Sequence, residues 1–321
     1  MTVRASKPSL NLREALSELN KPSGVAGEAM LRAETPQEQF NLIGAGRKNL
    51  IINGGFDVWQ RGTSQTTDGY GSVDRWAGVN TLSGASFSKA TRGLQWQGTV
   101  GTTPWYNGIA QKIENVWQYL SDQTVVTVSF KLTVNRAEST STAKSSMWDY
   151  SRVKNAGEYT LPSVSGTYSY TVDLYEAVAG DIFDLGFYFG DGDYIIENVQ
   201  LELGSVATPF EHRSYGEELA LCQRYYQDHT NEDVSRAVLP YTTTLAYSDS
   251  VIFPVTMRAT PTITVSNGQY YNGGWRTPSS SLVYRQNING FNWEPSANSS
   301  HLYTQWQPFL GKFRYTADAE L

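Results

Sequence analysis

The chain has 321 residues, enough for two domains; 13% of them are aromatic and only 17% are charged. A disordered chain is highly charged and poor in aromatics, so this composition excludes disorder for most of the sequence. The formal net charge of −6 argues against a nucleic-acid partner, because a nucleic-acid binder needs a basic face. No stretch approaches the ~20 consecutive apolar residues of a membrane span, so we expect no insertion into a membrane.

The first residues, MTVRASKPSLNLREALSEL, contain no apolar segment of a secretory signal, so we expect synthesis in the cytoplasm. Most of the helical signal lies in residues 1–47. Leucines that follow a capping Ser9 recur at helical spacing and predict a short helix over 9–20. An N-cap threonine followed by proline predicts a second over 35–43. Helices this short cannot bury a core alone, so we expect them to pack against identical chains.

Between Asn49 and Phe210 the hydrophobic residues recur with a period of two, which is typical of strands. The Gly190–Asp193 segment is predicted to be a tight turn that closes a hairpin. Many short strands separated by such turns indicate a β-sandwich, specifically a jelly roll. Strands are expected over 125–134, 168–174, 183–189 and 194–203, and shorter ones near 49–52, 73–79, 85–89, 94–97 and 108–113.

Residues 214–230 interrupt the strand pattern. Ser214 stands three residues before Glu217, which is a capping box, and apolar residues follow at helical spacing. This predicts one connecting helix, in which the single cysteine, Cys222, is an apolar packing residue.

The last part of the chain is again predicted to be β, with two long loops, Gly268–Ser281 and Asn287–His301. We therefore expect a mainly β protein with helices in 1–47, a jelly-roll sandwich over 48–211, a connecting helix in 212–233 and a C-terminal β-sandwich tip over 234–321.

Two segments mark the ends of the central domain. The opening is Asn49-Leu-Ile-Ile-Asn-Gly-Gly-Phe-Asp57, and the close is Tyr194-Ile-Ile-Glu-Asn-Val-Gln-Leu-Glu202. They resemble the entry and exit strands of carbohydrate-binding-module jelly rolls of the family 4, 9 and 22 kind. The resemblance implies the same fold for this part of the chain.

A longer set of landmarks runs through the chain in consistent order: the opening block through Trp59-Gln-Arg-Gly62, Asp74-Arg-Trp76, Val199–Tyr226, Phe253–Pro261 and Tyr315–Leu321. These segments resemble bacteriophage tail fibre proteins. The resemblance implies a structural virion protein of the phage tail that forms a homotrimer and binds a bacterial surface polysaccharide or protein. It also implies that the N-terminal residues attach to other tail or adaptor proteins of the virion.

The sequence offers little for catalysis. His212, His229 and His301 have no partner at the spacing of a nucleophilic or metal site. Asp191 and Asp193 are the residue type of a glycosidase pair, but the glycines beside them favour a role in a turn. We predict that the chain is not an enzyme. The alternatives to a receptor-binding fibre are a tail-associated glycan depolymerase and a virion fibre without a receptor role.

Several aromatic residues fall outside any alternation and lie beside amides. Aromatic rings of this kind stack on the C–H faces of sugars, and they are also enriched where protomers meet. We expect the receptor site in the C-terminal domain, because loop residues on a rigid scaffold often carry function. The candidate receptor or carbohydrate contacts are Tyr270, Tyr271, Trp275, Asn289, Trp293 and Trp306, with Trp105 and Trp148 in the central domain.

A structural calcium ion is considered for the central domain. Glu197 has the same parity as the apolar residues that follow it, which predicts a carboxylate on a buried face, and Asp57 is placed to supply a second ligand. The slightly favoured alternative is that Arg61 or Arg75 pairs with one of these carboxylates.

Overall fold

The computed structural model describes residues 48–79, 85–98, 107–114, 116, 124–137, 143–149, 154–174, 182–297 and 299–320. The two helices expected in residues 1–47 and the candidate Trp105 lie outside these ranges. Residues Asn49–Leu321 belong to one compact unit of the chain.

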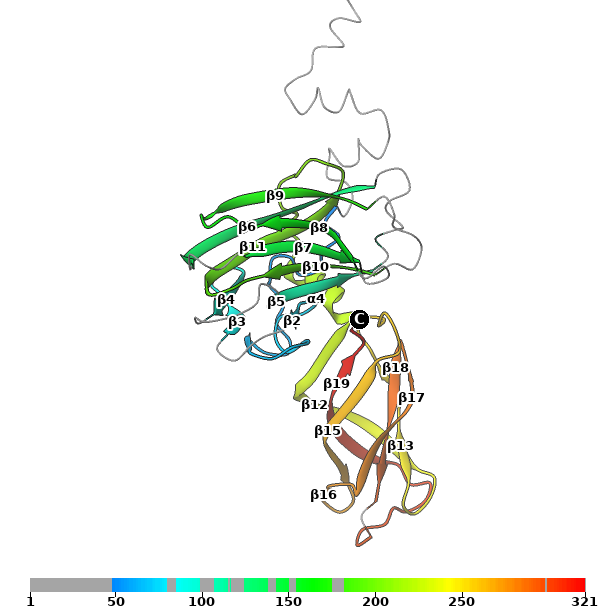
Figure 1. The fold of residues 1–321 in the computed structure, drawn as a ribbon. Coiled ribbons are helices and arrows are strands. Elements are labelled where there is room, and N and C mark those ends of the chain that lie inside the picture. Colours follow the sequence, from blue (N-terminus) through cyan, green and yellow to red (C-terminus); the bar gives the residue numbers. More distant parts are fainter. Residues whose placement is uncertain are drawn as a thin grey trace, which may run out of the picture. The chain divides into compact units, whose positions relative to one another are not determined.

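The first part of this unit is a β-sandwich of the jelly-roll type, as predicted, and Figure 1 shows its two layers. All strand pairs in it are antiparallel. The six-stranded sheet has the order β1 (Ser64–Gln65), β3 (Ala85–Lys89), β4 (Leu94–Gly98), β11 (Gly192–Leu203), β6 (Val125–Ala137) and β9 (Gly166–Asp173). The five-stranded sheet has the order β2 (Ala77–Val79), β5 (Gly108–Ile113), β10 (Phe183–Tyr188), β7 (Lys144–Asp149) and β8 (Lys154–Thr160).

Alternating apolar residues form the core between these two sheets. Val126, Val128 and Phe130 of β6 are buried, and so are Phe183 and Phe187 of β10. The rings of Phe130 and Phe187 meet edge to face with centroids 5.1 Å apart, so one contact joins the two layers. The period-two pattern therefore predicted β6, β9, β10 and β11 and their buried face correctly. The strand expected near 49–52 is absent, the one expected over 73–79 is confined to β2, and β7 and β8 were not predicted.

The predicted hairpin at Gly190–Asp193 is wrong. β10 pairs with β5 and β7, whereas β11 pairs with β4 and β6 in the other sheet. The segment carries the chain from one layer to the other. Local turn residues are the same for a hairpin and for a crossing of this kind, so the sequence could not separate the two.

The parity prediction for Glu197 is also wrong, because β11 contains a bulge. Asn198 has φ 55°, and the register with β6 shifts between Glu197 and Gln200. Ile196 before the bulge and Val199 after it both reach the core. One inserted residue reverses the alternation, so Glu197 faces away from the core and lies opposite Lys131 of β6.

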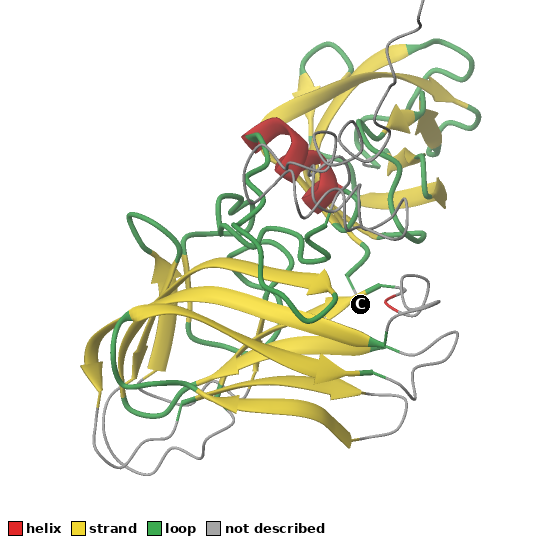
Figure 2. Cartoon of the chain, turned by 90° about the horizontal axis from the view of Figure 1, so that it is seen from above, coloured by secondary structure: helices red, strands yellow, loops and turns green. Residues whose placement is uncertain are grey.

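The connecting helix is present but shorter than expected. α4 (Tyr215–Gln223), the larger red helix in Figure 2, begins at the N-cap Ser214, whose hydroxyl accepts from the N–H of Glu217. Two residues separate it from β12 (Tyr226–Pro240), so this strand begins within the segment assigned to the connection. Cys222 is buried, and burial raises the pKa of its thiol well above the usual value, which fits a packing role.

The C-terminal part of the unit is a second pair of antiparallel sheets around its own core. Phe291 and Phe313 join the two sheets with ring centroids 6.1 Å apart. The five-stranded C-terminal sheet has the order β13 (Ala246–Ser248), β12, β19 (Phe309–Asp318), β15 (Thr262–Tyr271) and β16 (Trp275–Arg276). The three-stranded sheet has the order β14 (Val251–Ile252), β18 (Gly290–Ser296) and β17 (Ser280–Asn287).

The prediction of two long loops in this domain is wrong. The span Gly268–Ser281 contains the end of β15, all of β16 and the start of β17, and Asn287–His301 contains all of β18. Their glycine, asparagine and serine content concealed the short strands, because β-propensity reflects packing against neighbours more than composition.

Candidate functional site

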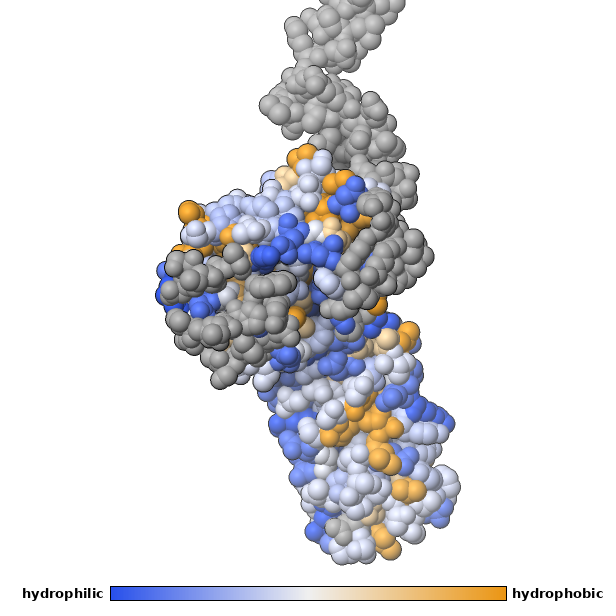
Figure 3. Space-filling model, in the orientation of Figure 1, coloured by the Kyte–Doolittle hydropathy of each residue, from blue (hydrophilic) through white to orange (hydrophobic). Residues whose placement is uncertain are grey.

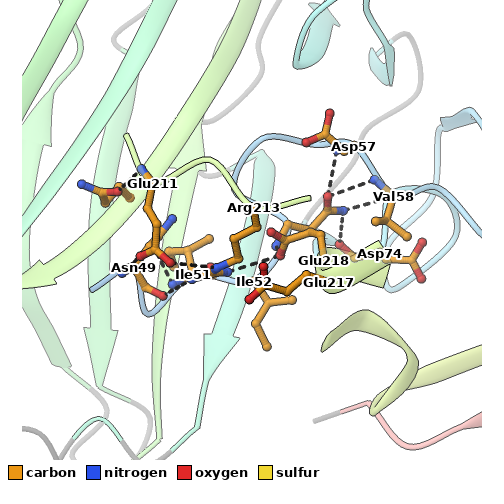
Figure 4. Close-up of polar contacts among 12 residues, drawn as sticks. Asn49, Ile51, Ile52, Asp57, Val58, Asp74, Glu211, Arg213, Glu217 and Glu218 are labelled. Carbon is orange, nitrogen blue, oxygen red and sulfur yellow. Dashed lines mark hydrogen bonds and ion pairs between the residues drawn. The ribbon is translucent and has the colours of Figure 1, made fainter. Parts of the chain in front are cut away.

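The motif residues that carry the tail fibre resemblance hold the chain together locally, as Figure 4 shows around Val58 and Asp74. The fully buried Asn53 amide donates to the carbonyl oxygens of Val58 and Asp74 at 2.9 and 3.0 Å. Its side-chain oxygen accepts from the N–H groups of Asp57 and Val58 at 2.8 and 3.0 Å. The backbone N–H of Asn53 donates to Glu218 of α4. Asn53 thus fixes the opening loop against the helix, and its role is structural.

Arg213 has a similar role on the other side of this loop. Its guanidinium donates to the carbonyl oxygens of Asn49 and Ile51 and pairs with Glu211 and Glu218. The side chain is 4% exposed, and buried charges need partners of this kind. These contacts tie the opening loop to the residues before α4 and to α4 itself, so we assign the arrangement to folding.

A second buried set, Arg61, Asp74, Arg75 and Glu320, is named here the buried ion cluster. Arg61 lies 3.5 Å from Asp74 and 3.3 Å from Glu320, and Arg75 pairs with the other Glu320 oxygen. Arg61 also lies 3.6 Å above the ring of Tyr226. Burial raises the pKa of Asp74 despite these neighbours. The cluster links the first sandwich to the end of β19.

The residues suggested for calcium do not gather into a ligand set. Glu197 pairs with Lys131 at 2.8 Å, whereas Arg61 and Arg75, the expected partners, pair with other carboxylates. Asp57 is exposed. Among the described ranges, no group of three or more His, Cys, Asp or Glu side chains is placed to hold a metal ion. Calcium binding remains an untested prediction whose stated basis, a carboxylate on the core face, is absent.

Asp191 and Asp193, the candidate glycosidase pair, lie where the chain crosses between the sheets. Asp191 is buried, whereas Asp193 accepts hydrogen bonds from Gln95, Gln97 and Asn135. Those amides lower the pKa of Asp193 against the opposing effect of partial burial. A general acid needs a raised pKa, so Asp193 is poorly suited to the general-acid role of a glycosidase pair.

Three of the predicted aromatic contacts are not free surface residues. Trp293 and Tyr270 are fully buried in the C-terminal core, and Trp293 packs on Phe313 with ring centroids 4.8 Å apart. Trp148, expected outside any alternation, lies half-buried in β7. Alternation along β18 turns Trp293 toward the domain core, but the glycines and asparagines around it concealed the strand in the sequence.

The other C-terminal candidates are exposed. Tyr271 and Trp275 pair across β15 and β16, with ring centroids 5.7 Å apart at an edge-to-face angle, and they are 50% and 42% exposed. Trp306 is 61% exposed, and Asn289 accepts a hydrogen bond from Thr256. The structure brings together Tyr271 and Trp275, and their pairing depends on the Gly273-Gly274 turn, where Gly273 has φ 65°.

A polar groove of about 510 Å³ lies on the outer side of β19. Both neighbours of β19 bulge at the same level: β12 between His229 and Val234, and β15 between Ser266 and Gln269. Bulges disrupt the ladder and redirect side chains, and they are over-represented beside active sites. The groove is lined by Asp233, Val265, Ser266, Asn267, Gly268, Gln269, Thr277, Pro278, Ser281, Lys312 and Arg314.

Three charged residues of this groove form the groove trio: Asp233, Lys312 and Arg314. Asp233 accepts from Arg314 Nε at 2.9 Å and lies 3.3 Å from Lys312 Nζ. These two partners lower the pKa of Asp233. Lys312 Nζ also lies 4.5 Å from the centroid of the Trp275 ring, so the trio adjoins the exposed aromatic pair.

Sequence reasoning missed the groove trio. Lys312 and Arg314 alternate with the buried Phe313 and Tyr315, and this alternation was available as a signal for an outward-facing pair. Nothing local indicates that Asp233 lies beside them, because it precedes Lys312 by 79 positions along the chain.

No family model matches the chain, and no curated protein matches it. It is similar to a solved family 4 carbohydrate-binding module, at 17% identity over 48% of this chain and 99% of that one, with a TM-score of 0.36. It is also similar to the CBM22-1 xylan-binding domain of Paenibacillus barcinonensis Xyn10C, at 12% identity over 50% and 100% of the two chains, with a TM-score of 0.30. Discoidin II of Dictyostelium discoideum matches at 13% identity over 71% and 82%, with a TM-score of 0.19. At these TM-scores the similarities carry no argument about function.

Within the described part of the chain, no helix is long and apolar enough to cross a membrane, and α4 has nine residues.

Proposed function

We propose that the protein is a structural fibre of a bacteriophage tail that acts as a homotrimer and binds a saccharide on the bacterial surface through its C-terminal domain. The ordered sequence landmarks between residues 49 and 321 support the fibre role. The observation that carries the binding role is the exposed pair Tyr271 and Trp275 beside a groove lined mostly by hydroxyl, amide and charged side chains.

Such a surface suits a sugar for a physical reason. The two rings offer apolar faces to C–H groups, while Ser266, Asn267 and Gln269 offer hydrogen bonds to hydroxyls. On the face drawn in Figure 3, hydrophilic and neutral residues predominate over the C-terminal domain and orange patches interrupt them. A wet surface of this type supports weak binding, which three copies on a trimer would strengthen by avidity.

An adsorption assay tests the proposal. The free protein, added to the host cells before the phage, is expected to block adsorption. Trp275→Ala is expected to lose this block, whereas the matched control Tyr284→Ala is expected to keep it. Tyr284 is a comparable ring, 49% exposed, on β17 of the three-stranded sheet.

Two outcomes would overturn the proposal. One is unimpaired adsorption at saturating wild-type protein. The other is release of oligosaccharides from the purified surface polysaccharide, which would make the protein a depolymerase. Sedimentation is expected to give the mass of a trimer, and a stable monomer at micromolar concentration would contradict that part.

A further inference from the structure

The groove beside Trp275 carries an excess of positive charge. Lys312 and Arg314 face a single carboxylate, Asp233, so the trio has a formal charge of +1 on a chain whose net charge is −6. The described contacts of Arg314 use only two of its five N–H groups, one with Asp233 and one with the carbonyl of Thr230. Among the described residues, the ammonium group of Lys312 has Asp233 as its one ionic partner. Both cations therefore retain donors for a ligand.

The shape of the groove places these donors beside an aromatic platform. Lys312 connects the two features, because its ammonium group contacts Asp233 on one side and the Trp275 ring on the other. Gly268 keeps the groove open above the core. A β-carbon there would lie 2.9 Å from Cζ2 of Trp293 and 3.0 Å from the Ser281 hydroxyl oxygen.

A buried donor with no partner among the described residues lies close to Gly268 of the groove lining. The Nε1–H of Trp293 is buried and has no hydrogen-bond partner in the described part of the chain. The adjacent ring carbon, Cε2, lies 3.5 Å from the position that a β-carbon on Gly268 would take, so the donor is close to the groove lining. A buried N–H without a partner is costly, and such a group in a native protein calls for an explanation such as a bound water or a functional role.

We propose that the groove binds an acidic saccharide, in which a carboxylate is received by Lys312 and Arg314 while the adjoining sugar ring lies on Trp275. This inference rests on the proposed glycan-binding function and specifies its ligand class. A guanidinium fork matches a carboxylate geometrically, and an ammonium group adds a point charge. Asp233 holds both cations in position and competes with the incoming carboxylate.

The test uses the full-length protein and an array of oligosaccharides that contain uronic or sialic acid, each printed beside its carboxyl-reduced counterpart. We expect the wild type to bind the acidic member of at least one pair about tenfold more tightly, and to lose this preference as salt screens the charges. Lys312→Gln and Arg314→Gln are each expected to weaken that binding about tenfold. Asp233→Asn is expected to strengthen it, because the competing carboxylate is gone.

Lys89→Gln is the matched control. It removes the same charge from an exposed position on the first sandwich, away from the groove lining, and is expected to bind as the wild type does. The Asp233→Asn result guards against misfolding, because a damaged domain would not bind more tightly.

The inference is overturned if no acidic member binds, or if the carboxyl-reduced members bind as well as the acidic ones. If the protein binds neutral saccharides and Trp275→Ala abolishes that binding, the ligand is not acidic. The inference is then wrong, but the proposal of glycan binding still holds. Saccharide binding that Trp275→Ala leaves unchanged would overturn the assignment of the site itself.

Discussion

The buried ion cluster and the groove trio both pair basic side chains with carboxylates, but in opposite environments. Arg75 and Glu320 are 1% and 5% exposed, whereas Arg314 and Asp233 are 34% and 35% exposed. The carboxyl pKa values differ accordingly: burial raises the pKa of Asp74, while hydrogen bonds from Arg314 and Lys312 lower that of Asp233. A buried charge is committed to its protein partners, whereas a surface charge can exchange its partner for a ligand. This difference is why we assign the first cluster to folding and the second to binding.

The largest expected effect on stability comes from the buried ring of Trp293. Trp293→Ala removes a fully buried ring from the C-terminal core and should lower the free energy of unfolding by about 3–5 kcal/mol. Thermal or denaturant unfolding measures this. Loss of ligand binding without loss of stability would show that the ring is a contact instead of a core residue.

The next effect concerns the buried ion cluster. Glu320→Gln leaves Arg75 and Arg61 without their shared countercharge and should cost about 2 kcal/mol of unfolding free energy. Asp318→Asn is the matched control, because Asp318 contacts the same Arg61 at 3.4 Å but is 44% exposed. Its replacement should cost less than about 1 kcal/mol. If both variants lose the same unfolding free energy, burial does not explain the difference between the buried ion cluster and the groove trio.

The pH dependence of stability should report on Glu114, which contacts Arg258 and lies 3.6 Å from Arg224. Partial burial tends to raise its pKa, but the hydrogen bonds of Arg258 and Tyr225 and the charges of both arginines lower it overall. A carboxyl with a lowered folded-state pKa contributes stability above its ordinary pKa and loses that contribution as the pH falls through the folded-state value. Glu114→Gln should therefore flatten the acid side of a melting-temperature profile, and an unchanged profile would contradict this.

The smallest expected effect on stability comes from Lys312 of the groove trio and Trp275 of the aromatic pair. Lys312→Gln and Trp275→Ala should each change the unfolding free energy by less than about 1 kcal/mol, because both side chains are partly exposed. A double-mutant cycle between them should give a coupling of roughly 0.5 kcal/mol for the cation–π contact. A much larger coupling would mean that the contact between Lys312 and Trp275 stabilises the domain, which would contradict a role in ligand binding.

Parts of the candidate site were predictable and parts were not. The sequence indicated Tyr271 and Trp275 as aromatics beside amides, and the structure leaves both exposed. It grouped Tyr270 and Trp293 with them, although both are core residues, because the strands that bury them contain many small polar residues. Asp233 and Arg314 come from strands that are neighbours only in the folded sheet, so no local pattern could associate them.

The sequence by itself determined the mainly β class, the strand at 125–134, the capped helix after Ser214 and the apolar role of Cys222. Those features depend on side-chain period and on capping within a few residues, which a linear sequence records directly. Only the tertiary structure decided that Gly190–Asp193 crosses between sheets and that Glu197 turns away from the core. Strand partners and single-residue bulges depend on contacts between distant segments, and one inserted residue is enough to reverse which face a side chain occupies.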